Sequence, residues 1–202
     1  MKKRTAFIGV ILFLYTFPFL NDEVFARSNV NNILVAELRP IPGIKSGSYR
    51  LFNRAGKNYE KGNYKEAIKL FSKYIIQYPT YAEDYVRDAY YYRALSKVSI
   101  EDYDGAISDL TKAIEIYPEY TSAYLNRGAI KLIIEDHYAA ISDFTKAIEI
   151  NPESVQAYLF RGATKLKIED LKGACFDAKK IASLGYINEK NNDWIKNNCK
   201  TF

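Results

Sequence analysis

Chemistry in this 202-residue chain could come from one histidine, three acidic pairs and two cysteines. Acid–base and nucleophilic catalysis need a nucleophile, a base and an orienting group within hydrogen-bond reach of one another. The chain has a single histidine, and its acidic pairs recur 34 residues apart, at Glu101-Asp102, Glu135-Asp136 and Glu169-Asp170. This spacing holds the pairs apart, and no glycine-rich phosphate loop is present. We therefore expect no catalytic residues, no metal, no cofactor and no small-molecule substrate, so the chain is not expected to be an enzyme.

The spacing of the acidic pairs comes from an internal repeat. Residues 90–118 align without gaps with residues 124–152, and a third copy at the same offset of 34 occupies 158–186. A more divergent copy occupies 51–79, at an offset of 39. Each copy holds two stretches with helical apolar periodicity, separated by a short turn. The repeat therefore predicts four helical hairpins.

The turns within the copies carry typical helix N-cap residues, namely Asn63, Asp102, Asp136 and Asp170. Three copies close on a proline that ends the second helix, at Pro79, Pro118 or Pro152, and the fourth ends on Gly185, a predicted helix C-cap. The histidine, His137, occupies the turn position that Tyr64, Tyr103 and Leu171 hold in the other copies. We therefore interpret it as a structural residue.

One copy carries a pattern of six residue types in the order small residue, Tyr, Ala, Phe, Ala and Pro. They are Gly128, Tyr138 (one place late), Ala140, Phe144, Ala147 and Pro152. On these residues the chain resembles the tetratricopeptide-repeat family, and the resemblance covers residues 51–186. It implies an all-α, right-handed α-solenoid of four helical hairpins, at about 49–86, 87–120, 121–154 and 155–186. Residues 188–200, with Trp194 and Ile195 on one side, are expected to form a C-terminal capping helix.

In the family, the first helix of each hairpin lines a concave groove that binds proteins. The resemblance assigns this role to Phe52, Tyr59, Tyr91, Leu95, Val98, Leu125, Ala129, Leu132, Leu159, Ala163 and Leu166. The set is mostly apolar, and the Lys and Asn residues that clamp a C-terminal carboxylate in cochaperone repeats are absent from it. An apolar or aromatic protein or peptide segment suits this groove better. The alternative is that the same stripe is packed between neighbouring helices.

The N-terminus predicts export. Lys2, Lys3 and Arg4 precede an apolar run from Ala6 to Leu20, and Val24-Phe25-Ala26 fits a signal-peptidase site. Residues 1–26 are thus expected to be a signal peptide, which makes the protein periplasmic or secreted. An uncleaved anchor is the alternative, and it would hold the protein at a membrane as an envelope-assembly accessory subunit. Residues 27–48 are expected to be a linker or arm that docks on the first repeat or lies in the groove.

The net charge of +5 is mildly basic. Lysines recur every fourth residue at Lys57, Lys61, Lys65, Lys69 and Lys73, as on a solvated helix face. An anionic partner or a membrane surface is the alternative for this stripe. No basic tract interleaved with aromatic residues is present, so we expect no nucleic-acid binding.

A charged triplet recurs in three copies, as Arg93, Lys97 and Asp109, then Arg127, Lys131 and Asp143, then Arg161, Lys165 and Asp177. In the first copy Asn58 and Leu70 replace the Lys and the Asp together. This joint loss indicates that the basic residues of one helix face the Asp of its partner. We interpret the triplets as structural ion pairs.

The two cysteines are predicted to form a disulfide. Cys175 stands where the other copies have Ile, so it should be buried against the next segment, which carries Cys199. An oxidising export compartment favours the bond. Redox catalysis is the alternative, although the chain has no Cys-x-x-Cys motif.

Overall fold

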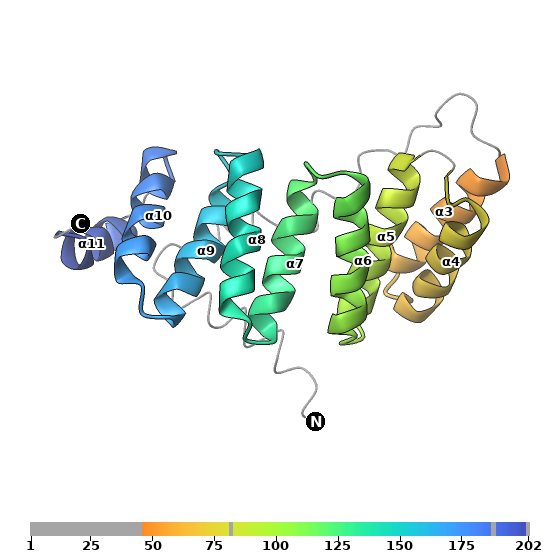
Figure 1. Cartoon of the computed structure of the whole chain (residues 1–202), viewed down its shortest axis with the longest axis horizontal. Coiled ribbons are helices and arrows are strands. Elements are labelled where there is room, and N and C mark those ends of the chain that lie inside the picture. The colour runs from red at the N-terminus through yellow and green to blue at the C-terminus, as the bar shows by residue number, and fades with distance from the viewer. Residues whose placement is uncertain (1–45, 81–82, 187–188, 201–202) are drawn as a thin grey trace. The chain divides into compact units, whose positions relative to one another are not determined.

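The computed structural model describes residues 46–80, 83–186 and 189–200, and helices joined by short turns make up this part of the chain (Figure 1). The predicted signal peptide and residues 27–45 of the predicted arm lie outside the described residues. The helices are α3 (Ser46–Glu60), α4 (Tyr64–Gln77), α5 (Glu83–Val98), α6 (Tyr103–Ile116), α7 (Thr121–Ile133), α8 (His137–Ile150), α9 (Val155–Lys167), α10 (Leu171–Ser183) and α11 (Glu189–Asn198). None of these helices is both long and apolar enough to cross a bilayer.

The chain divides into compact units on either side of the bond between Ile130 and Lys131. In the 37–130 unit, α3 packs on α4, α4 on α5, and α5 on α6. In the 131–202 unit, α8 packs on α9, α9 on α10, and α10 on α11. Helices that follow one another in the sequence are therefore packed neighbours, which is the all-α architecture of helical hairpins that the repeats predict.

All four predicted N-cap positions are confirmed, and three of these residues cap the helix through the side chain. A side-chain oxygen of Asp102 accepts a hydrogen bond from the backbone N–H of Gly105. In the same way, Asp136 accepts from the N–H of Ala139, and Asp170 from that of Gly173. Asn63 is the N-cap residue of α4, as predicted, but its side chain makes no cap hydrogen bond there. Its amide instead donates to Oδ1 of Asn58 at 3.3 Å.

The residue before each capping Asp has a left-handed backbone. Glu101, Glu135 and Glu169 have φ of 64°, 64° and 61°, and Gly62 holds the same place in the first hairpin with φ 75°. The N–H of Glu101 donates to the carbonyl of Val98 and that of Asp102 to Lys97, and the other three turns repeat this pair of bonds. Each turn is thus a Schellman motif, in which glycine is the usual left-handed residue. Gly185, with φ 86°, ends α10 in the same way, as the sequence predicts.

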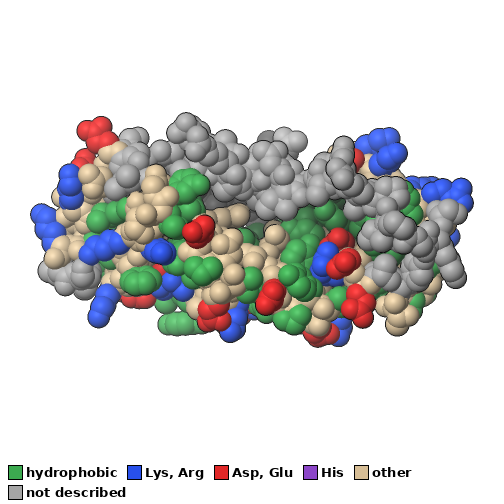
Figure 2. Space-filling view, turned by 90° about the horizontal axis from the view of Figure 1, so that it is seen from above, with side chains coloured by type: hydrophobic (Ala, Val, Ile, Leu, Met, Phe, Trp, Pro, Cys, Tyr) green, Lys and Arg blue, Asp and Glu red, His purple; other side chains and the backbone are tan. Residues whose placement is uncertain are grey.

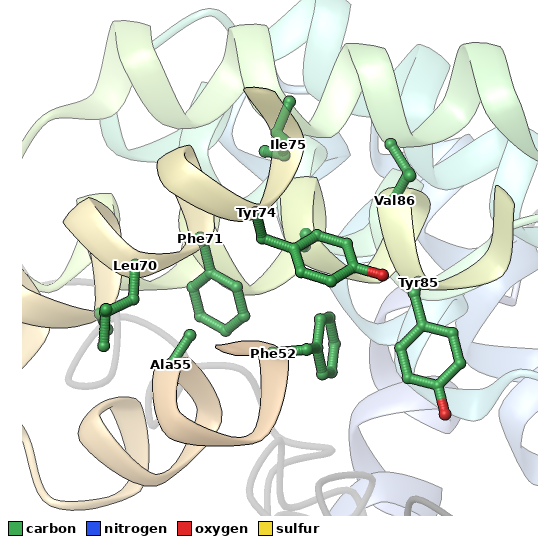
Figure 3. Packing of buried hydrophobic residues seen from close by; sticks show 10 residues of the cluster. Phe52, Ala55, Leu70, Phe71, Tyr74, Ile75, Tyr85 and Val86 are labelled. Atoms are coloured by element: carbon green, nitrogen blue, oxygen red, sulfur yellow. The ribbon is translucent and has the colours of Figure 1, made fainter. Parts of the chain in front are cut away.

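Aromatic residues fill the core of the 37–130 unit. Phe52 of α3 lies at its centre, 1% exposed, with its ring 5.6 Å from that of Phe71, 5.4 Å from Tyr74 and 5.1 Å from Tyr85 (Figure 3). These pairs meet edge to face, the arrangement that the ring quadrupoles favour. Ala55 is fully buried and lies beside these rings, so a larger side chain there would separate α3 from α4.

The core of the 131–202 unit ends on α11. Tyr158, Leu159 and Ile181 are buried, and Trp194 and Ile195 pack against their cluster. A disulfide joins Cys175 of α10 to Cys199, the pairing that the sequence predicts, with the two Cα atoms 5.6 Å apart. Helix α11 therefore covers apolar side chains of the last hairpin, as expected of a capping helix.

The charged triplets form the ion pairs that the repeats predict. Asp109 accepts a hydrogen bond from Nε of Arg93 at 2.8 Å and pairs with Nζ of Lys97 at 2.8 Å. Asp177 accepts from Nε of Arg161 at 3.1 Å and pairs with Nζ of Lys165 at 3.1 Å, and Lys131 pairs with Asp143 at 2.8 Å. The carboxylates of all three Asp residues are almost fully buried. Each is therefore compensated by basic groups from the other helix of its hairpin.

Each arginine of these triplets also binds a hydroxyl group on the helix before it. Nη1 of Arg93 donates to Ser72 at 3.0 Å, that of Arg127 to Thr111 at 2.9 Å, and that of Arg161 to Thr145 at 3.1 Å. The sequence reasoning missed these partners. The guanidinium groups of Arg93 and Arg161 thus each connect their own hairpin with the preceding one.

We expect Cys199→Ser to lower the free energy of unfolding of the last hairpin by about 3 kcal/mol, since the bond closes a loop across 24 positions. Thermal unfolding and hydrogen exchange should show α11 and α10 opening earlier, with α3 to α6 unchanged, because repeat stability depends mainly on neighbouring contacts. Titration of two free thiols in the native, non-reduced protein would contradict the disulfide.

Candidate protein-binding groove

The predicted groove residues lie on the first helices of their hairpins, in both units. In the 37–130 unit they are Phe52 and Tyr59 on α3, Tyr91, Leu95 and Val98 on α5, and Leu125 and Ala129 on α7. In the 131–202 unit they are Leu132 on α7, and Leu159, Ala163 and Leu166 on α9. Tyr59, Val98, Ala129 and Leu166 are partly exposed, and the other seven are buried. Their role in binding stays a prediction.

In the 37–130 unit, tyrosines form a connected cluster around α5. The ring of Tyr92 lies 6.0 Å from that of Tyr59 on α3 and 5.4 Å from that of Tyr91. Tyr91 in turn lies 5.0 Å from Tyr120, which precedes α7. Tyr59, Tyr92 and Tyr120 are only half-buried, so the cluster combines apolar ring faces with phenol groups near the surface.

An amide fixes the position of Tyr91. Nδ2 of Asn126 on α7 donates to the phenol oxygen of Tyr91 at 2.9 Å and to the backbone carbonyl of Ser122 at 2.8 Å. Asn126 is one residue from Leu125, a predicted groove residue, and is half-buried. The amide therefore ties α7 to α5 beside the tyrosine cluster.

A carboxylate lies on the same face of α5. Asp88 precedes Tyr91 by three residues and Tyr92 by four, which are the spacings of neighbours on a helix surface. Its Oδ1 atom accepts a hydrogen bond from Nε of Arg87 at 2.8 Å and a longer one from the hydroxyl of Tyr120 at 3.4 Å. The side chain of Asp88 is 22% exposed. A partly desolvated acid thus lies beside the tyrosines.

Arg87 is held by two acids and two rings. Nη1 donates to Oδ1 of Asp84 at 2.7 Å, and the guanidinium carbon lies 5.3 Å from the ring centre of Tyr117 and 5.1 Å from that of Tyr120. Such contacts combine ion pairing with cation–π attraction. This cluster connects the start of α5 to the segment between α6 and α7.

Burial dominates the ionisation of these groups. Desolvation raises the pKa of Asp88, and the hydrogen bond and charge of Arg87 partly offset it. Desolvation, followed by the charges of Asp88 and Glu60, raises the pKa of the Tyr92 phenol to about 12. Burial likewise raises the pKa of Tyr59 to about 12, and raises that of Tyr120. The phenols therefore stay protonated and can donate hydrogen bonds far above neutral pH.

The sequence reasoning missed the polar members of this region. It selected apolar and aromatic positions, whereas Asp88, Tyr92, Tyr120 and Asn126 lie among them. The signal that could have found Asp88, Tyr92 and Asn126 is helical spacing, because each is one to four residues from a selected position. Charged and hydrophobic side chains also intermingle on the face of the molecule in Figure 2.

His137 is the first residue of α8 and directly follows the turn in which the sequence analysis placed it. Its Nδ1 atom is buried and has no hydrogen-bond partner among the described residues. In that part of the chain, no three His, Cys, Asp or Glu side chains are grouped so that they could hold a metal ion.

The described helices form repeated hairpins, which have a Schellman motif at the turn, and three of which carry a buried Asp. This architecture defines a helical-repeat protein of the α-solenoid class. Tetratricopeptide-repeat models match residues 54–81, 88–120 and 121–154. The chain is a tetratricopeptide-repeat protein. None of the curated proteins matches the sequence closely enough to be called a relative.

Solved structures share this fold at low sequence identity. A crystal structure of MamA is 23% identical with TM-score 0.62, and the match covers 74% of this chain and 81% of that one. MamA 41-end from Desulfovibrio magneticus RS-1 is 17% identical with TM-score 0.64, covering 76% and 84%. The second TPR domain of human RPAP3, in complex with the HSP70 peptide SGPTIEEVD, is 22% identical with TM-score 0.53, covering 58% and 94%. Identities this low support the fold alone.

We expect the pKa of Tyr92, raised to about 12, to fall toward its ordinary value of 10 in Asp88→Asn, because one of the carboxylates that disfavour the phenolate is lost. Since the folded-state pKa exceeds the unfolded one, the neutral phenol stabilises the fold below about pH 10, and this contribution is lost as the pH rises through about 12. Tyrosine Cζ NMR titration gives the pKa directly. An unchanged value in Asp88→Asn would place the carboxylate away from the phenol, and Asp104→Asn serves as the control.

Proposed function

We propose that this protein is a non-enzymatic scaffold that holds a segment of a partner protein against the first helices of its hairpins. The observation that carries the proposal lies in the 37–130 unit. There the half-buried phenols of Tyr59 and Tyr92, whose rings lie 6.0 Å apart, form no hydrogen bond with any described residue, and Tyr92 is four residues from the half-buried Asp88 on α5. A surface that mixes ring faces with such donors and acceptors matches the composition of protein-binding sites.

The family supports the same class of function. Two structural neighbours are RPAP3 repeat domains, one bound to an HSP90 peptide, SRMEEVD, and the other in complex with an HSP70 peptide, SGPTIEEVD. Those chains share 21% and 22% identity with this one, so they indicate that the fold can hold a peptide and do not identify the partner. Partner identity depends on the side chains that line the surface.

We also propose that the protein is exported and works in the periplasm or outside the cell. The apolar N-terminal run with its three basic residues supports this, and the disulfide between Cys175 and Cys199 would persist in such a compartment. The partner would then be an envelope or secreted protein.

A photo-crosslinking amino acid placed at Val98, which is partly exposed on α5, should capture a partner protein in cells that express the full chain. The same probe at Ser108, on the exposed face of α6 in the same unit, should not, because second helices face away from the predicted groove. Mass spectrometry of the adducts identifies the partner segment. Equal adducts at both positions, or adducts only at Ser108, would contradict binding on the first helices.

Export is tested by the N-terminus of the protein recovered outside the cytoplasm, which should begin at Arg27. A start before Asn21 would contradict the predicted cleavage. Recovery of the uncut chain in the membrane fraction would instead support an anchored accessory subunit.

A further inference from the structure

We propose that the groove of the 37–130 unit selects a partner segment that carries a lysine or arginine, which Asp88 binds. This inference rests on the proposed function, because it gives the charge of the segment that the scaffold would hold. It concerns one face of α5 and the side chains that contact that face. The occupant is a cationic stretch of another protein chain.

The charged groups that contact one another at the start of α5 have an excess of negative charge. Asp84 and Asp88 both bind Arg87, and Glu60 is close enough to raise the pKa of the Tyr92 phenol together with Asp88. Asp84 and Asp88 with the guanidinium of Arg87 leave a net charge of −1 at the start of α5, and Glu60 on α3 lies between the exposed Lys57 and Lys61 in the sequence. The approaching segment therefore meets a negative field that water screens only in part, because Asp88 and Tyr92 are half-buried.

Asp88 keeps an oxygen available for a donor. Both of its hydrogen bonds go to Oδ1, and no described residue donates to Oδ2. The phenol oxygens of Tyr59 and Tyr92 likewise accept no hydrogen bond from the described residues. Lysine carries three N–H donors and arginine five, with no acceptor, so a basic side chain can use these oxygens without leaving a group of its own unpaired.

The ring faces favour the same occupant. The guanidinium of Arg87 already lies over Tyr117 and Tyr120, which shows that a cation is accommodated among tyrosines at this end of α5. Tyr92 follows Asp88 by four residues on α5, and its ring is stacked on that of Phe71 and lies 6.0 Å from that of Tyr59 on α3. A second cation there would combine attraction to these rings with the charge of Asp88.

An acidic segment would be repelled by the carboxylates on this face. The HSP90 and HSP70 peptides named for the RPAP3 structures end in EEVD, so a segment of that kind would bring like charges toward Asp88 and Glu60. Uncompensated like charges exclude a ligand even where its shape fits. The same fold would then bind a segment of reversed charge.

The test is selection of peptides from a random dodecapeptide display library on the purified full chain. We expect the bound peptides to be enriched in Lys and Arg. Replacement of the basic residue of a selected peptide by glutamine should weaken binding at least about tenfold, since a charge-assisted hydrogen bond is lost. Asp88→Asn should weaken the original peptide similarly and the glutamine version little, whereas Asp88→Glu should restore part of the affinity.

Asp104→Asn provides the matched control, because Asp104 is an exposed carboxylate of the same unit on the second helix α6. Thermal unfolding of each variant shows whether it is folded. Peptides enriched in Asp and Glu, or basic peptides that bind Asp88→Asn as well as the parent, would overturn the inference and leave the scaffold function standing. If the library yields no peptide and Val98 captures no partner, the scaffold function falls together with the inference.

Discussion

A buried carboxylate that must be paired is the constraint on which this structure depends. Asp109, Asp143 and Asp177 lie in the interior of their hairpins, where an uncompensated charge would cost several kcal/mol. The compensating groups come from the other helix, so the two helices can pack only in the register that brings the charges together. Because Arg93 also donates to Ser72, the same charge fixes α5 against the hairpin before it. The orientation of α5, and with it the face that carries Asp88 and Tyr92, follows from this pairing.

The first hairpin reaches a similar packing without the buried charge. Leu70 replaces the Asp and is buried, Asn58 replaces the Lys, and its amide donates to the backbone of its own helix. Aromatic rings around Phe52 supply the packing between helices instead. This hairpin also has exposed Lys57, Lys61, Lys65, Lys69 and Lys73, as the sequence predicts for a solvated face. Hairpins with an apolar core and hairpins with a buried ion pair can thus occur in one repeat fold, provided that every buried charge has its partner.

The sequence predicted the elements whose cause is local or repeated. Helical hairpins, aspartate caps, ion pairs and the cysteine pairing followed from an internal alignment that shows which positions change together. The alignment also located the N-cap of α4 at Asn63, but not the bond of its side chain, because that amide binds the neighbouring Asn58 instead of the helix end. It did not foresee the left-handed Glu101, since that conformation is usual only for glycine. The polar residues beside the tyrosine cluster, such as Asp88 and Asn126, were missed because periodicity alone selects apolar positions. Hydrogen bonds between helices depend on how the helices pack.

The arginine bond to the preceding hairpin gives the array a direction. Ser72, Thr111 and Thr145 occupy equivalent places, and each accepts the guanidinium of the next hairpin. The equivalent place in the last hairpin is Lys179, which cannot accept a hydrogen bond from a cation. The first hairpin, in turn, lacks the buried acid that would need such a donor. A further hairpin of the same kind would therefore place two positive charges together at α10, where α11 packs instead. The hydroxyl acceptor of the earlier hairpins is thus replaced by an ammonium group on the hairpin against which α11 packs.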